Sequence, residues 1–232
     1  MSAADHPAVR TEDVWKIFEH EAEEVLAVRG VDLTIERGEF TALAGPSGSG
    51  KTTLLNLIGG LTRPSRGRVR VAGRDLTEMS NQELAALRLE QVGFVFQAYN
   101  LLPVLTALEN AEFPLLLRGL DEIERGKRVR ALFERTGLAG LEERRPGKLS
   151  GGQQQRVAVI RAVVGRPALV LADEPTANLD SAASESLLQV MEELNRGQGT
   201  TFVFATHDPQ VMEHSRRLVR LVDGRIASDE KH

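Results

Sequence analysis

The sequence contains no cysteine, no apolar run long enough to cross a bilayer and no excess of positive charge. Without cysteine, disulfides and thiol chemistry are excluded, which fits a reducing compartment. No segment approaches the roughly 18 consecutive apolar residues of a membrane-spanning helix. The first residues, MSAADHPAVR, lack the apolar core of a secretion signal, so we expect the protein to stay in the cytosol.

The charge balance argues against a general nucleic-acid surface, which needs a basic patch. Lys and Arg number 29 against 33 Asp and Glu, which gives a net charge of −4 at pH 7. Two arginine-rich stretches, residues 63–70 and 125–130, could form local patches, but solvated turns and helix faces are the simpler interpretation. We therefore expect no specific nucleic-acid partner.

The composition is that of an ordinary soluble globular protein, with 41% hydrophobic and 27% charged residues over 232 positions. Apolar runs and helical spacing of apolar residues predict strands and helices along the chain. The expected strands are Val9–Val14, Val31–Ile35, Phe40–Ala44, Arg68–Val71, Val92–Phe96, Leu169–Ala172, Thr201–Ala205 and Arg217–Val222. The expected helices are Lys51–Gly59, Asn81–Leu89, Ile123–Thr136, Gly151–Val164 and Ala182–Asn195.

Strands and helices alternate on either side of a helical middle, which predicts an α/β fold with a mostly parallel sheet. We expect a single domain over 1–232. Residues 1–97 and 166–232 would form the α/β core, and 98–165 an inserted helical subdomain. The N-terminal strands, joined by short turns such as residues 36–39, predict a small antiparallel sheet beside the core.

The stretch GPSGSGKT fits the phosphate-loop pattern G-x-x-x-x-G-K-[ST] between an apolar strand and a helix. Small residues let successive N–H groups curl around phosphate oxygens at the start of a helix. Lys51 would reach the β- and γ-phosphates, and Thr52 would offer its hydroxyl to Mg²⁺. The expected nucleotide-binding residues here are Gly45, Pro46, Ser47, Gly48, Ser49, Gly50, Lys51, Thr52 and Thr53.

Two carboxylates end the apolar run ALVLADEP, at the sheet edge where ligands bind in open α/β folds. Asp173 is a candidate metal ligand, and Glu174 a candidate base that deprotonates an attacking water. Acids at strand ends are often merely solvated, and the phosphate loop is what favours the functional interpretation.

His207 and Gln97 each follow a predicted strand. An imidazole at position 207 could hydrogen-bond a γ-phosphate, although a lone histidine is usually structural or exposed. The amide of Gln97, where the core meets the helical insertion, could touch the metal or the attacking water. Taken alone, Gln97 would pass for a surface residue.

The stretch LSGGQQQR offers Ser150 as a helix cap and two glycines, but no cation and no metal ligand. Such a half-site binds phosphate weakly by itself. It becomes useful where it closes over a phosphate already held by a phosphate loop. The alternative, a capped helix with a flexible lead-in, accounts for Ser150 but poorly for the adjacent glycines.

The phosphate loop, Gln97, LSGGQ, LVLADEP, TANLD and ATHD occur in the order found in the nucleotide-binding subunits of ABC transporters, which the chain resembles from about Val9 to Ile226. The resemblance implies a RecA-like P-loop NTPase core that binds ATP and Mg²⁺. It also implies a head-to-tail pair of copies, in which Ser150, Gly152 and Gln153 act on the partner's ATP. Asp180, in ANLD, would then lie between the two sites.

The stretches GFVFQAYNLLPVLTALENAEFPLLLRG and LIGGLTRPSRG are similar to the branch that contains lipoprotein-release (LolD-type) and macrolide-export (MacB-type) ATPases. That likeness implies an aromatic near position 18 that stacks on adenine. In this sequence the aromatic is Phe18. The alternatives are that the Phe18 ring packs in the core, or that Trp15 stacks on adenine in its stead. The segment from Gln97 to about Leu117 would contact a membrane partner.

These features together predict an ATP-binding and ATP-hydrolysing subunit of a bacterial ABC transporter. It would dimerise around two ATP and power extrusion or extraction by integral membrane permease subunits, at the cytoplasmic face of the inner membrane. Glu174, His207 and Gln97 would be catalytic, and Thr52, Gln97 and Asp173 would hold the metal. An ABC-type ATPase acting on DNA or on the ribosome is the alternative; neither the transported substrate nor the membrane partner follows from the sequence.

Overall fold

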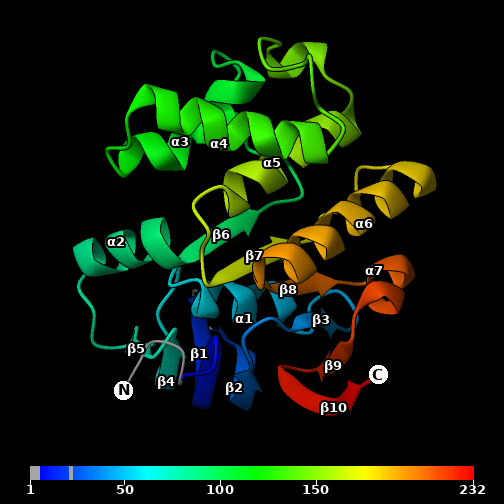
Figure 1. Cartoon of the computed structure of the whole chain (residues 1–232). Helices are drawn as coiled ribbons and strands as arrows, with labels where there is room; N and C mark the ends of the chain where they lie inside the picture. Colours follow the sequence, from blue (N-terminus) through cyan, green and yellow to red (C-terminus); the bar gives the residue numbers. More distant parts are fainter. Residues whose placement is uncertain (1–5, 21–22) are drawn as a thin grey trace.

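The computed structural model describes residues 6–20 and 23–232, in which two β-sheets lie side by side (Figure 1). The larger sheet has the order β10-β9-β3-β8-β7-β6, and all its neighbours run parallel except β10, which is antiparallel to β9. Its strands are β3 (Phe40–Ala44), β6 (Val92–Val95), β7 (Leu169–Asp173), β8 (Thr201–Thr206), β9 (Arg217–Val222) and β10 (Arg225–Lys231).

The smaller sheet is antiparallel, with the order β2-β1-β4-β5. Its strands are β1 (Val9–His20), β2 (Glu23–Ile35), β4 (Arg66–Val71) and β5 (Arg74–Asp75). The expected antiparallel sheet is therefore present, but the role given to the turn at residues 36–39 was wrong. That turn leads from β2 into β3 of the other sheet, because FTALA is buried throughout and needs parallel neighbours on both sides.

Seven α-helices connect these strands within the described residues, and two of them, α3 and α7, were not expected from the sequence. In α3 the polar residues Asn110 and Glu112 are buried while Leu116 and Leu117 are exposed, and Pro114 interrupts the pattern, so the sequence shows no helical period. α7 is too short for a period to be visible. The helices are α1 (Lys51–Ile58), α2 (Asn81–Gln91), α3 (Ala107–Leu117), α4 (Glu122–Arg135), α5 (Gly151–Val163), α6 (Ser181–Gln198) and α7 (Pro209–His214).

The two faces of the large sheet are covered by different elements, and strand alternation assigns each side chain to one of them. Phe40, Ala42 and Phe202 belong to a core shared with helices α3 to α7. Leu43 and Val203 belong to a second core shared with α1, α2 and the small sheet. In Figure 1, α3, α4 and the start of α5 form the part of the molecule farthest from the small sheet. The predicted α/β class with a mostly parallel sheet is confirmed.

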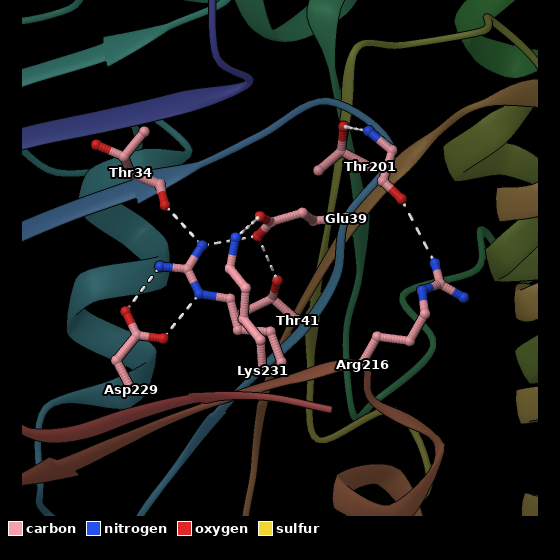
Figure 2. Close-up of polar contacts among 9 residues, drawn as sticks. Thr34, Glu39, Thr41, Thr201, Arg216, Asp229 and Lys231 are labelled. Carbon is pink, nitrogen blue, oxygen red and sulfur yellow. Dashed lines mark hydrogen bonds and ion pairs between the residues drawn. The ribbon is translucent and has the colours of Figure 1, made fainter.

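Arg217 on β9 links its own strand to three other segments through Asp229 on β10, Thr34 on β2 and Glu39 in the turn before β3, the three partners labelled in Figure 2. Its guanidinium donates two hydrogen bonds to the Asp229 carboxylate, at 2.8 and 2.7 Å, and one each to the Thr34 carbonyl and to Glu39. Lys231 adds a hydrogen bond to Glu39 at 3.1 Å. Arg217 is only 8% exposed, so this network holds β10 and the turn at residues 36–39 against the core.

The network lowers the pKa of both carboxyl groups. The hydrogen bonds from Arg217 hold the pKa of Asp229 below its usual range, against a smaller opposing effect of burial. For Glu39, burial raises the pKa, but the hydrogen bonds from Arg217 and Lys231 outweigh it and the net shift is downward. Both carboxylates are therefore stabilised in their charged form.

No α-helix within residues 6–20 and 23–232 has the length and apolar character that spanning a lipid bilayer requires.

Candidate functional site

A cleft of about 980 Å³ opens between the small sheet and the edge of the large sheet where β3, β7 and β8 end. This is the edge at which open α/β sheets bind ligands. It brings together most of the predicted site residues. Lining it are Phe18, Glu24, Val25, Leu26, Ala27, Arg29, Pro46, Ser47, Gly48, Gly50, Lys51, Thr52, Thr53, Gln97, Glu174, His207 and Asp223.

The loop of residues 45–50 has the conformation that its glycines permit. Gly45, Gly48 and Gly50 all have positive φ. A Cβ at Gly45 would lie 2.2 Å from the Leu221 carbonyl oxygen, and one at Gly50 2.3 Å from the Ala27 carbonyl oxygen. Side chains at either position would therefore push the loop away from its neighbours.

The loop leads directly into α1, whose N-cap Gly50 provides no side-chain hydrogen bond to the first turn. The N–H groups there and the positive end of the helix dipole are available to an anion. The Lys51 ammonium donates to the carbonyls of Gly45 and Pro46, at 2.8 and 3.0 Å. This position, at the mouth of a loop of backbone N–H groups, is suited to phosphate.

Thr52, which lines the cleft, reaches Asp173 at the end of β7: its hydroxyl donates to that carboxylate at 2.9 Å. Burial raises the pKa of Asp173, while the hydrogen bond from Thr52 acts in the opposite direction. No group of three or more His, Asp or Glu side chains in the described ranges could hold a metal alone. One hydroxyl and one carboxylate nevertheless fit Mg²⁺, which usually takes one or two protein oxygens together with phosphate oxygens and water.

Glu174, one residue beyond β7, is held by both oxygens of its carboxylate. It accepts from the Thr206 hydroxyl at 3.1 Å, and its other oxygen lies 2.7 Å from His207 Nδ1. Because an ionised carboxylate only accepts, Nδ1 carries the proton and a neutral His207 keeps Nε2 as a free acceptor. The backbone of Glu174 has φ 46°, a left-handed conformation fixed by a hydrogen bond from its N–H to the Ala205 carbonyl.

At the rim of the cleft the Phe18 ring is 43% exposed, and the Lys16 ammonium lies 4.9 Å from its centre. Val25, the cross-strand partner of Phe18, is also exposed and lines the cleft. The alternative of a core position for Phe18 is therefore wrong. Trp15 does not line the cleft, and its indole N–H donates to Asp13.

The segment Ser150–Gln153 lies in a separate pocket of about 350 Å³ that shares no described residue with the cleft. Ser150 caps α5 in a reciprocal arrangement with Gln153, in which each side chain binds the other's backbone N–H. The same pocket contains Gly152 and Asp180, which caps α6 through the Ala183 N–H. Within one copy, the glycine half-site therefore does not face the phosphate loop.

Gln97 is exposed and lines the cleft, and its backbone carbonyl accepts a hydrogen bond from the Asn178 side chain at 2.8 Å. Arg29, Val25 and Asp223 also line the cleft but were not expected there. Asp223 lies in the β9–β10 turn, which contacts the phosphate loop through a hydrogen bond from the Gly224 N–H to the Ser49 carbonyl.

Comparisons with known proteins identify the family of the chain. A sequence profile of the ABC transporter family matches residues 28–177. The LolD ATP-binding protein of a lipoprotein-releasing system from Anaeromyxobacter dehalogenans is 50% identical over 206 residues, covering 88% of this chain and 86% of its own length. An ABC transporter ATP-binding protein from Thermotoga maritima is 45% identical, covering 94% of this chain and 93% of its own.

The macrolide export ATP-binding/permease protein MacB of Bordetella avium is 46% identical over 97% of this chain, which spans only 34% of that protein. Among solved structures, the dimeric, post-hydrolysis ATP-binding cassette MJ0796 with bound ADP and Pi has a TM-score of 0.89 at 40% identity, covering 96% of this chain and 98% of that one. Sequence profile, relatives and structure lead to one conclusion: the chain belongs to the ABC transporter family.

Proposed function

We propose that two copies of this chain close head to tail around two Mg-ATP and hydrolyse them to drive a transporter. The chain is an ABC-type ATPase of the kind represented by LolD and MacB, and a dimeric relative of the same fold binds ADP and Pi. The observation that supports the pairing best is that each copy offers a full phosphate cleft and, in a separate pocket, the half-site at Ser150.

In this proposal the loop N–H groups and Lys51 bind the phosphates, and Thr52, Asp173 and Gln97 hold Mg²⁺. Mg²⁺, when bound, neutralises charge on the β- and γ-phosphate oxygens. Glu174 would orient a water and take its proton as that water attacks the γ-phosphorus in line, while the bond from that phosphorus to the bridging oxygen breaks and ADP leaves. His207 Nε2 positions the reacting groups, and its ring is oriented by Glu174 through the 2.7 Å contact at Nδ1.

The half-site completes the second copy's cleft. The free N–H groups at the start of α5, the Ser150 hydroxyl and the Gln153 side chain would close over the partner's γ-phosphate, with Gly152 allowing close approach. Ser150 Oγ accepts from the Gln153 N–H at 3.3 Å, which leaves its O–H free to donate. Asp180, in the same pocket, would lie at the boundary between the two copies.

Dimerisation is the direct test. The Glu174→Gln variant should sediment as a dimer with Mg-ATP and mainly as a monomer with Mg-ADP or without nucleotide, because slow hydrolysis leaves the closed state intact. Adding Ser150→Arg should abolish the ATP-dependent dimer, because the larger side chain fills the half-site. The cleft of this double variant should still bind ATP. A species that stays monomeric with Mg-ATP, at concentrations that saturate the cleft, would contradict the head-to-tail arrangement.

Phe18 and Val25 form the surface on which we expect adenine to stack. Phe18→Ala should raise the KM for ATP by about 10-fold and leave kcat within about 2-fold, because stacking on an aromatic ring contributes about 1–3 kcal/mol, which the ground and transition states share. Trp15→Phe, on the same strand but outside the cleft, is the matched control. Steady-state hydrolysis as a function of ATP concentration gives both constants, and an unchanged KM would exclude the stacking role.

We expect the segment from Gln97 to Leu117 to contact integral membrane permeases. Through that contact the subunit would lie at the cytoplasmic face of the inner membrane. Some of its apolar residues pack into the core, including Ala111 and Leu115. Others border a groove of about 380 Å³ between α2, α3 and α5, where Leu117 is 58% exposed. We take residues 98–165 as the subdomain that moves with the permease.

LolD and MacB suggest extraction or export as the process that is driven. An action on nucleic acid is less well supported, because the arginines of residues 63–70 are already engaged within the protein. Arg66 pairs with Asp13 and Arg70 with Glu12, and Arg63 donates to the carbonyls of Thr77 and Met79.

A further inference from the structure

Tyr99, the one tyrosine of the sequence, fills the place of the side chain that Gly151 lacks. A Cβ at Gly151 would lie 2.9 Å from the Tyr99 hydroxyl and 3.7 Å from both the Asn178 carbonyl and the Leu179 side chain. Three segments thus converge at the first glycine of the half-site: the loop that follows Gln97, the start of α5 and the turn before Asp180. Gly152 is different, because a Cβ there would meet only Ala183, at an ordinary 3.5 Å.

The backbone at Tyr99 is strained and held from the same helix. Tyr99 and Asn100 have φ of 57° and 50°, in the left-handed region that residues with side chains rarely adopt. Arg161 donates to the carbonyls of both, at 2.8 and 2.5 Å. Arg161 and Gly151 lie at opposite ends of α5, so this helix contacts Tyr99 through its backbone at one end and through its hydroxyl at the other.

A second contact links this segment to the turn before Asp180. The Asn178 side chain donates to the Gln97 carbonyl, while the Asn178 carbonyl borders the space at Gly151. Gln97 is two residues from Tyr99 and lines the cleft. α5 therefore contacts the Tyr99 side chain at its start and the Tyr99 backbone near its end, and the Tyr99 N–H donates to the Phe96 carbonyl, one residue before Gln97.

We propose that Tyr99 is a positioning residue that couples two sites within one copy. When the half-site at Ser150 moves, Tyr99 changes the position of Gln97 in the cleft of the same copy. This rests on the proposed function, in which the half-site closes on the partner's nucleotide. Closure of the half-site on the partner's nucleotide would then alter the position of Gln97 in the cleft of the same copy, through the contact between Tyr99 and Gly151.

The test is a second-site rescue. Gly151→Ala should lower kcat for Mg-ATP by about 10-fold or more, because its methyl group would lie well inside contact distance of the Tyr99 hydroxyl. Tyr99→Phe removes the atom that the methyl group meets. The double variant should therefore recover to within about 3-fold of Tyr99→Phe alone, a non-additivity typical of residues in contact. The KM for ATP should change by less than about 2-fold throughout, since neither Tyr99 nor Gly151 lines the cleft and the adenine surface and the phosphate loop keep their residues.

Two outcomes would overturn the proposal: normal turnover in Gly151→Ala, or a loss that Tyr99→Phe does not reverse. The second would place the damage in the half-site itself. Gly152→Ala is the comparison, because Tyr99→Phe should not rescue any defect that it causes. Thermal unfolding of each variant separates a folding defect from a catalytic one.

A second measurement needs no variant at these positions. Incorporation of 3-fluorotyrosine gives a single ¹⁹F resonance, since the sequence has one tyrosine. In Glu174→Gln protein this resonance should shift when Mg-ATP drives dimerisation and should stay in place with Mg-ADP. An unchanged resonance in a confirmed dimer would refute the positioning role alone, whereas failure to dimerise or hydrolyse ATP would count against the proposed function.

Discussion

Glu174→Gln should lower the rate of ATP hydrolysis by about 10² or more while the affinity for ATP changes little. The substitution keeps the shape of the side chain but removes the acceptor for the water's proton. The amide can keep both contacts if its oxygen accepts from the Thr206 hydroxyl and its NH2 donates to His207 Nδ1, which requires the other neutral tautomer of that ring. The expected loss corresponds to about 2.7 kcal/mol or more of transition-state stabilisation.

The measurement is phosphate release at saturating Mg-ATP, together with nucleotide binding by equilibrium titration. Glu213→Gln, which makes the same change at an exposed position on α7, controls for the loss of one charge. Turnover within a few-fold of the unmodified protein would assign the proton transfer to another group. A parallel loss of ATP affinity would instead indicate that Glu174 shapes the cleft.

Arg217→Met should destabilise the fold by about 3 kcal/mol, within the range found when one member of a buried ion pair is removed. Asp229 would lose two hydrogen bonds and Glu39 one, together with the positive charge of a guanidinium that is only 8% exposed; Lys231 would still reach Glu39. For a chain of this size we expect the Tm to fall by about 6–12 °C. Arg220→Met, on the same strand but exposed, should change the Tm by far less.

The pH dependence gives this second prediction a distinct signature. The pKa values of Asp229 and Glu39 are lowered in the folded chain, so their contribution to stability is present above the unfolded pKa of about 4 and is lost as pH falls through the folded values. The difference in Tm between the unmodified protein and Arg217→Met should therefore be full at pH 7 and shrink below about pH 4. A difference that is constant across this range would mean that packing, and not charge, accounts for the loss.

The residues whose placement the sequence predicts are those specified by short stretches. The loop at residues 45–52 carries its own conformation in its glycines, and Asp173 and Glu174 follow an apolar strand whose end must lie at the sheet edge. The face of α4 formed by Val129, Leu132 and Phe133 is likewise buried, as its spacing indicates.

The parts that the sequence did not predict depend on contacts between distant segments. Val25 lines the cleft only because β1 and β2 pair it with Phe18, and β2 begins earlier than its alternation suggests. β10 carries mostly polar, exposed residues, so no apolar pattern indicates a strand. A local signal was nevertheless present: Asp223–Gly224 is a dipeptide typical of tight hairpin turns, and both residues have positive φ.

The contacts of Lys51 have a kinetic consequence for the arrival of a nucleotide. With two of its three ammonium hydrogens already directed at the carbonyls of Gly45 and Pro46, the side chain is fixed before any phosphate enters. An ordinary surface lysine loses up to about 2 kcal/mol of rotamer entropy on being immobilised, and here folding has already met that cost. Capture of ATP should therefore need little rearrangement of this loop, and slow conformational steps should belong to the approach of the two copies.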